Sequence, residues 1–229
     1  MFATTTASHG ATTHGVTIPV GRLRLEGDLS IPQDATGIVV FAHGSGSSRH
    51  SPRNQFVARQ IRDAGVGTLL FDLLTAREED VDARTGHLRF DIGLLANRLE
   101  GVASWVRTND ETSHLRIGFF GASTGAAAAI VAAARLGSAI GAVVSRGGRP
   151  DLAGGALRTV ASPTLFIVGG NDVPVIALNR HAFDQMMCHR EMVVVPRATH
   201  LFSEPGALEE VARLAADWFA RYLQPTNGR

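Results

Sequence analysis

The chain has 229 residues, of which 45% are hydrophobic, and this suits one α/β domain with a substantial core. The net charge of +1 provides no basic field for nucleic acid, and no apolar run is long enough to span a bilayer. The single cysteine, Cys188, cannot form an internal disulfide, so we expect a cytoplasmic protein.

The order of predicted elements indicates the fold class. Residues 1–15 are Thr-rich, lack the features of a signal peptide and are expected to form a flexible tail before a single domain over 16–229. Alternation of apolar and polar residues over 16–30 predicts antiparallel strands at a sheet edge. Continuous apolar runs predict buried strands over 37–42, 66–74, 116–120, 140–145, 164–168 and 192–195. Helical spacing predicts helices over 56–61, 90–106, 124–136, 177–187 and 208–222.

This alternation of strands and helices predicts an α/β fold. We expect a mostly parallel sheet of about seven to eight strands with helices on both faces. In such sheets ligands bind beyond the carboxyl ends of the strands. The residues that directly follow each strand are therefore the candidates for chemistry.

The segment Gly121-Ala122-Ser123-Thr124-Gly125 matches the pattern Gly-x-Ser-x-Gly. It lies between a predicted strand and an Ala-rich predicted helix, which is the setting of a nucleophile elbow. Side chains two residues before and after the serine would collide in that sharp turn, so glycine is needed at both positions. The alternative is an ordinary helix N-cap made by Ser123 or Thr124. The context favours Ser123 as a nucleophile.

A serine hydroxyl needs a base, and in this fold the chain order is nucleophile, acid, histidine. His200 follows the last predicted strand, at the sheet edge where Ser123 is expected; the alternative is a loop histidine that caps the last helix. Asp172 follows the strand before it and would orient the imidazole. An Asx turn is the alternative role for Asp172, and Asp151 is a rival acid. We therefore predict a triad of Ser123, His200 and Asp172.

The tetrahedral intermediate of such a reaction needs N–H donors for its oxyanion. The backbone N–H of Thr124 is one expected donor, and the loop over 43–48 should supply the other. Ser45 is the expected second donor and Gly46 is the next candidate for that role; Gly46 is also a candidate for contact with the substrate. A Gly-rich phosphate cradle is the alternative, but the loop lacks the Gly-Lys-Ser/Thr ending and the Gly-x-Gly-x-x-Gly spacing. His43 is expected to brace this loop rather than to catalyse.

Several basic residues should lie at the same sheet edge and are candidates for contact with an anionic substrate group by bidentate hydrogen bonds. The candidates are His50, Arg53, Arg77, Arg146 and Arg149. The alternative is that they are surface residues paired with Glu78, Glu79 and Asp80. The segment between Ser145 and Pro163 has room for only one short helix or loop, which predicts little or no lid and an open site for small esters.

Three segments, 41–49 (FAHGSGSSR), 70–74 (LFDLL) and 144–151 (VSRGGRPD), together with the serine motif, resemble the α/β-hydrolase superfamily. More narrowly, the chain is similar to the dienelactone hydrolase-like group, including small bacterial hydrolases sometimes joined to phosphoribosyltransferase domains. The resemblance covers the chain from about residue 16 and implies a Ser-His-Asp mechanism without metal or organic cofactor. Dienelactone hydrolases proper carry a cysteine at the elbow, whereas this chain has Ser123, so ordinary ester or thioester hydrolysis is the expected chemistry.

These observations predict a serine hydrolase that cleaves small carboxylic esters through an acyl-enzyme intermediate. Its expected partner is a small-molecule ester, with no nucleic acid and no membrane, and a homodimer is left open. A thioesterase or acyl transferase would use the same triad, and rates on matched oxygen esters and thioesters would separate it. A hydrolase fold that only binds a ligand is the alternative from a different class, and failure of Ser123 to react with a fluorophosphonate would favour it.

Overall fold

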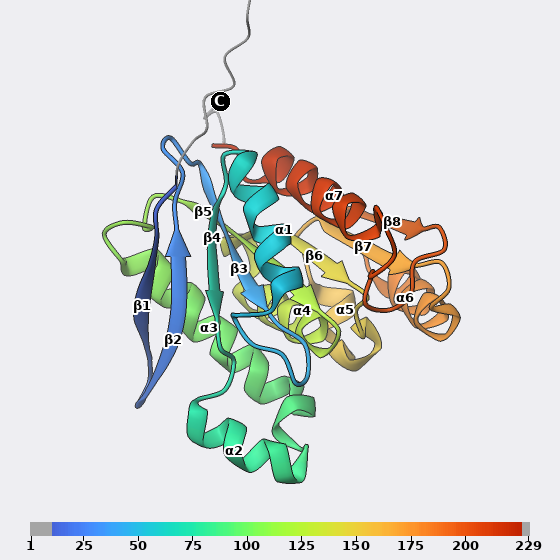
Figure 1. Cartoon of the computed structure of the whole chain (residues 1–229), viewed down its shortest axis with the longest axis horizontal. Helices are drawn as coiled ribbons and strands as arrows, with labels where there is room; N and C mark the ends of the chain where they lie inside the picture. Colours follow the sequence, from blue (N-terminus) through green and yellow to red (C-terminus); the bar gives the residue numbers. More distant parts are fainter. Residues whose placement is uncertain (1–10, 226–229) are drawn as a thin grey trace, which may run out of the picture.

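The computed structural model describes residues 11–225, which form an eight-stranded sheet in the order β1-β2-β4-β3-β5-β6-β7-β8 (Figure 1). The strands are β1 (Thr13–Val20), β2 (Leu23–Ser30), β3 (Gly37–Ala42), β4 (Gly67–Phe71), β5 (Arg116–Ala122), β6 (Ile140–Arg146), β7 (Thr164–Gly169) and β8 (Arg190–Val195). The pairs β1–β2 and β2–β4 are antiparallel, and all other pairs are parallel. The predicted mostly parallel sheet with an antiparallel edge is confirmed.

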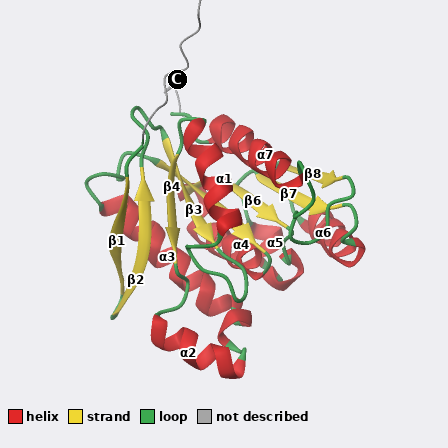
Figure 2. Cartoon of the chain, in the orientation of Figure 1, coloured by secondary structure: helices red, strands yellow, loops and turns green. Residues whose placement is uncertain are grey.

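Helices cover both faces of this sheet (Figure 2). The α-helices are α1 (Pro52–Asp63), α2 (Ala76–Thr85), α3 (Ile92–Thr108), α4 (Thr124–Leu136), α5 (Ala156–Thr159), α6 (Val173–Gln185) and α7 (Ala207–Tyr222). One apolar core joins the sheet to α3, α4, α5 and α6, and a second core joins it to α1 and α7. The central strands are buried on both sides, as in β3, where every residue is buried. Of the helices within residues 11–225, none is long and apolar enough to cross a bilayer.

Three features differ from the sequence-based expectations. α2 was not predicted, because its sequence AREEDVDART is polar and has no apolar stripe; a capping box between Thr75 and Glu78 starts it instead. β8 was expected to be buried, but it is the edge strand of the sheet and only Val195 in it is fully buried. β1 begins at Thr13, inside the tail expected over 1–15, whereas residues 1–10 lie outside the described part.

The connection between β6 and β7 is short, as predicted. It contains only a 3-10 turn, η3 (Pro150–Ala153), and the four-residue α5. No helical lid therefore rises from this connection. The helical segment that projects furthest at the carboxyl edge is instead α2, which follows β4 (Figure 1).

Candidate active site

Ser123 lies at the turn between β5 and α4 and has the backbone conformation of a nucleophile elbow. Its φ of 52° and ψ of −121° are strained for a residue with a side chain. Ser123 occupies the N-cap position of α4, yet its side chain makes no capping hydrogen bond. Ser123 is therefore not an ordinary serine N-cap, and its hydroxyl is available for other chemistry.

Two glycines make this turn sterically feasible. A Cβ on Gly121 would lie 2.4 Å from the Cα of Ala126, and a Cβ on Gly125 would lie 2.2 Å from the carbonyl oxygen of Ala42. Real Cβ atoms do not approach other atoms so closely, so both positions require glycine, as the motif predicts. The fully buried alanines of the following helix let α4 pack close against the sheet.

His200 and Asp172 are brought together from two neighbouring loops at the carboxyl edge. Asp172 follows β7 and His200 follows β8, and the distance between His200 Nδ1 and Asp172 Oδ2 is 2.7 Å. Asp172 stands at the N-cap position of α6 but its side chain makes no capping hydrogen bond. Its carboxylate instead bonds the imidazole of His200. The rival Asp151 binds Arg149 instead, with 2.8 Å between Arg149 Nη2 and its Oδ2.

The loop after β6 contacts both Ser123 and His200. The backbone N–H of Ser123 donates to the carbonyl of Arg146 over 3.3 Å, and the N–H of Arg149 donates to the carbonyl of Ser123 over 3.0 Å. Between these two residues, Gly147 packs directly against the histidine, because a Cβ placed there would lie 3.6 Å from His200 Cε1. The three predicted triad residues therefore lie on adjoining loops at one edge of the sheet.

The loop after β3 lies against the serine on another side. A Cβ on Gly44 would be 3.1 Å from the Cβ of Ser123, and the hydroxyls of Ser45 and Thr124 are 3.0 Å apart. Within the described chain, the backbone N–H groups of Ser45 and Thr124 donate to no backbone carbonyl or side chain. Gly46 takes a φ of 66°, which allows the tight turn closed by the N–H of Ser47 on the carbonyl of Gly44. These free donors suit the stabilisation of an oxyanion.

Two contacts from the end of β4 hold this loop in place. His43 Nε2 accepts the N–H of Leu73 over 3.1 Å and its Nδ1 bonds the carbonyl of Gly44 over 3.0 Å, so His43 braces the loop as predicted. Asp72 accepts the backbone N–H of Arg49 over 2.8 Å and also binds the Arg49 guanidinium. The second contact was not predicted. Its partners lie in the motifs FAHGSGSSR (41–49) and LFDLL (70–74), but no local pattern indicates that these segments meet.

The brace made by His43 predicts a pH dependence of stability. Burial is the main cause that lowers the pKa of His43 below its ordinary value of 6.5, against smaller opposing effects of Gly44, Asp72 and Glu79. Below pH 6.5, His43 binds a proton in the unfolded chain but stays neutral in the folded chain. The free energy of unfolding therefore falls as pH falls from 6.5 towards the pKa of His43 in the folded state. We expect a loss of at most about 1.4 kcal/mol per pH unit from this group.

Urea unfolding at pH 7.5 and 5.5 would measure this effect by comparing wild type with His43→Gln, whose amide oxygen can still accept the N–H of Leu73. The variant should lose less stability on acidification than wild type, whereas His114→Gln, at an exposed position, should behave as wild type. An equal loss in wild type and in His43→Gln would contradict the prediction.

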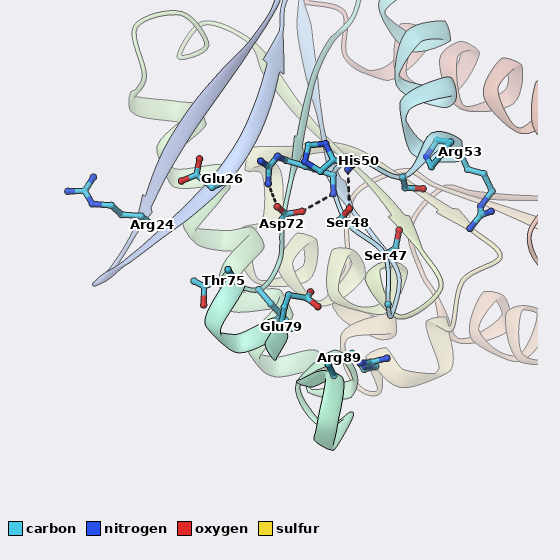
Figure 3. Close-up of a pocket in the computed structure, with 17 residues that line it drawn as sticks. Arg24, Glu26, Ser47, Ser48, His50, Arg53, Asp72, Thr75, Glu79 and Arg89 are labelled. Atoms are coloured by element: carbon cyan, nitrogen blue, oxygen red, sulfur yellow. Dashed lines mark hydrogen bonds and ion pairs between the residues drawn. The ribbon is translucent and has the colours of Figure 1, made fainter. Parts of the chain in front are cut away.

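A large open cavity of about 1070 Å³ adjoins the loop after β3 (Figure 3). Its walls come from β2, the loop over 46–51, the start of α1, and α2. Ser123 and His200 do not line it. A narrow pocket at His43, Ser45 and Thr124 is its neighbour, and Gly46, Leu74, Glu79 and Arg89 line both. The cavity therefore lies next to the expected oxyanion position.

The basic residues named from the sequence fall into two groups. His50 and Arg77 are exposed, and Arg149 is paired with Asp151. Arg53 and Arg146 are less exposed and form no ion pair with the described residues. The alternative, in which these residues pair with the acidic cluster of α2, is not seen among the described residues, where Glu78 binds Arg98. Within residues 11–225, no group of three His, Cys, Asp or Glu side chains is placed to hold a metal ion.

Solved structures show that this architecture is widespread. A dienelactone hydrolase from Anabaena variabilis ATCC 29413 superposes with a TM-score of 0.93 at 57% identity, covering 94% of this chain and 100% of that one. Est1E from Butyrivibrio proteoclasticus superposes with a TM-score of 0.75 at 15% identity, covering 91% of this chain and 98% of that one. The second likeness shows the α/β-hydrolase fold alone.

Curated sequences and a family model place the chain more narrowly. A Mycobacterium tuberculosis (strain H37Rv) protein named "Putative phosphoribosyl transferase" is 54% identical over 208 residues, which are 91% of this chain and 46% of that protein. The chain thus spans about half the length of the curated relatives it matches. The model of the dienelactone hydrolase family matches residues 25–225. The chain therefore belongs to the dienelactone hydrolase family.

Proposed function

We propose that the chain is a serine hydrolase that cleaves small carboxylic esters through an acyl-enzyme intermediate. The observation that carries this proposal is the conformation of Ser123, which keeps a strained φ of 52° and a hydroxyl free of any capping bond. Such strain persists only where the surroundings impose it, and it is concentrated at functional sites. The Asp172–His200 pair on the adjoining loops supplies the base that a serine nucleophile requires.

In the proposed mechanism, Nε2 of His200 takes the proton of the Ser123 hydroxyl as Oγ attacks the ester carbonyl carbon. Asp172 accepts the Nδ1–H of His200, which fixes the tautomer and stabilises the imidazolium. The N–H groups of Ser45 and Thr124 donate to the oxyanion. Collapse of the intermediate breaks the ester C–O bond, and His200 protonates the leaving alcohol. His200 then activates water, which releases the acid and restores Ser123.

The surroundings of the site favour small or partly exposed esters. The β6–β7 connection supplies only η3 and α5, so it carries no helical lid. The cavity of about 1070 Å³ is open to solvent and shares lining residues, among them Gly46, with the pocket beside Thr124. One side of the ester can extend into this cavity while the other remains near the surface.

Covalent labelling with a fluorophosphonate tests the proposal. The reagent should modify Oγ of Ser123, and mass spectrometry of the peptide that contains residue 123 should locate the adduct. Asp172→Asn removes the charge that stabilises the imidazolium and should slow labelling and turnover by a factor on the order of 10⁴. His200→Gln should reduce labelling at least as strongly, because the base is lost.

A matched control is His181→Gln, at an exposed position on α6, which should label at the wild-type rate. Failure of the folded wild-type protein to react, or labelling of another residue, would contradict the proposal. Wild-type labelling rates in Asp172→Asn would contradict the role given to that carboxylate.

A further inference from the structure

Arg146 is a buried charge without a partner in the described chain. It is the last residue of β6 and is only 8% exposed. Its Nε and Nη1 are buried and make no hydrogen bond, and its guanidinium forms no ion pair with the described residues. Burial first, and the charge of Arg53 second, lower the pKa of Arg146 to about 10, so the side chain stays charged at neutral pH. Buried charges are normally paired, because an unpaired one is costly.

A second unpaired cation lies at the start of α1, which packs on the same face of the sheet as Ala142 and Val144, the residues that alternate with Arg146 along β6. Arg53 lies in the first turn of this 12-residue helix, and its Nε is also buried without a partner. In Figure 3 the side chain of Arg53 points away from the carboxylate of Asp72. The N-terminus of a helix adds further positive potential, since its first N–H groups have no partner within the helix. Two arginines and a helix N-terminus repel one another unless an anion lies between them.

This cationic cluster adjoins the proposed nucleophile. The carbonyl of Arg146 accepts the N–H of Ser123 over 3.3 Å, and the next residue, Gly147, packs against His200. Arg53 lines the large cavity together with Ser47. The backbone of Arg146 thus lies beside Ser123, and Arg53 lies on the wall of the cavity next to the loop that carries Ser45.

Other arginines near the site are already neutralised. Arg49 binds Asp72, Arg89 binds Asp82, and Arg149 binds Asp151. Arg24 and Arg77 also have no carboxylate, but both are exposed to solvent. Arg146 and Arg53 are less exposed and have none within the described residues. Low exposure together with the lack of a carboxylate separates these two from the other three basic candidates, because His50 and Arg77 are exposed and Arg149 is paired.

We infer that Arg146 and Arg53 form an anion subsite that receives a carboxylate or phosphate group of the ester substrate. This inference rests on the proposed function and specifies its substrate class as anionic esters. Guanidinium groups bind both oxyanions through paired N–H donors, and Nε and Nη1 of Arg146 are two such donors that have no hydrogen-bond partner within the described residues.

Matched ester pairs test the subsite. On the acyl side, mono(p-nitrophenyl) succinate is compared with p-nitrophenyl pentanoate, and on the alcohol side, 4-acetoxybenzoate is compared with phenyl acetate. We expect wild type to prefer the anionic member of at least one pair by tenfold or more in kcat/KM. Arg146→Gln should lower that ratio at least tenfold, and Arg53→Gln should lower it less. Arg213→Gln, an exposed arginine on α7, should keep the wild-type ratio.

Thermal unfolding of Ser123→Ala with inorganic phosphate gives a readout that does not depend on hydrolysis. At constant ionic strength set with chloride, phosphate should raise Tm, and the additional Arg146→Gln change should abolish the shift. If no ester is hydrolysed but phosphate stabilises through Arg146, the proposed function fails while the anion site stands. Equal rates within both ester pairs, together with no phosphate shift, would overturn the inference; a phosphate shift with equal rates would overturn its assignment to the substrate.

Discussion

We expect Ser123→Ala to abolish hydrolysis of p-nitrophenyl acetate, with kcat falling by a factor on the order of 10⁶ as in other serine hydrolases that lose their nucleophile. Alanine retains the Cβ and therefore experiences the same backbone restraint at φ 52°. The hydroxyl makes no capping bond to α4, so its removal takes away no structural hydrogen bond there. The folded state should consequently keep its stability within about 0.5 kcal/mol. Loss of activity would then report chemistry alone.

The matched control is Ser104→Ala, at an exposed position on α3, which should hydrolyse the ester at the wild-type rate. Circular dichroism and thermal unfolding of each variant establish that the fold survives. Turnover by a folded Ser123→Ala protein at even a hundredth of the wild-type rate would eliminate the assignment of Ser123 as nucleophile.

Much of the site was predictable because its determinants are local. The bounds of α4 agree with those predicted, since a glycine-bounded, Ala-rich run defines both ends. Asp172 and His200 were identified from their positions after consecutive strands, and parallel strands bring such positions to one edge. Sequence order therefore sufficed to place the acid and the histidine beside each other.

The remaining features depend on tertiary contacts between segments with no shared pattern. α2 is stabilised by its capping box and by the ion pair of Glu78 with Arg98, so hydrophobic periodicity could not reveal it. Arg146 and Arg149 stand in one short motif, yet only Arg149 has a carboxylate within reach. Which arginine keeps a free charge is decided by the positions of acidic groups elsewhere in the fold.

The second large expected effect concerns Gly125, where helix propensity and packing predict opposite results. Alanine is favoured over glycine inside a helix by about 1 kcal/mol, so propensity alone predicts that Gly125→Ala stabilises the protein. The structure predicts the reverse, because the new Cβ would lie 2.2 Å from the carbonyl oxygen of Ala42 and 2.5 Å from that of His43. These are backbone atoms of β3 and the following loop, and they cannot move away as a flexible side chain could.

We therefore expect Gly125→Ala to lower the free energy of unfolding by about 3 kcal/mol or more, measured by urea denaturation, since overpacking against rigid neighbours is costly. Ester hydrolysis should fall as well, because relief of the clash separates the turn at Ser123 from the loop that carries Ser45. Gly155→Ala is the matched control: its φ of −60° and ψ of −20° suit alanine, and its Cβ would meet nothing within 4 Å. That variant should be stabilised by up to about 1 kcal/mol. A Gly125→Ala protein as stable as wild type would show that α4 does not pack against β3 this closely, and the proposed elbow geometry would fail with it.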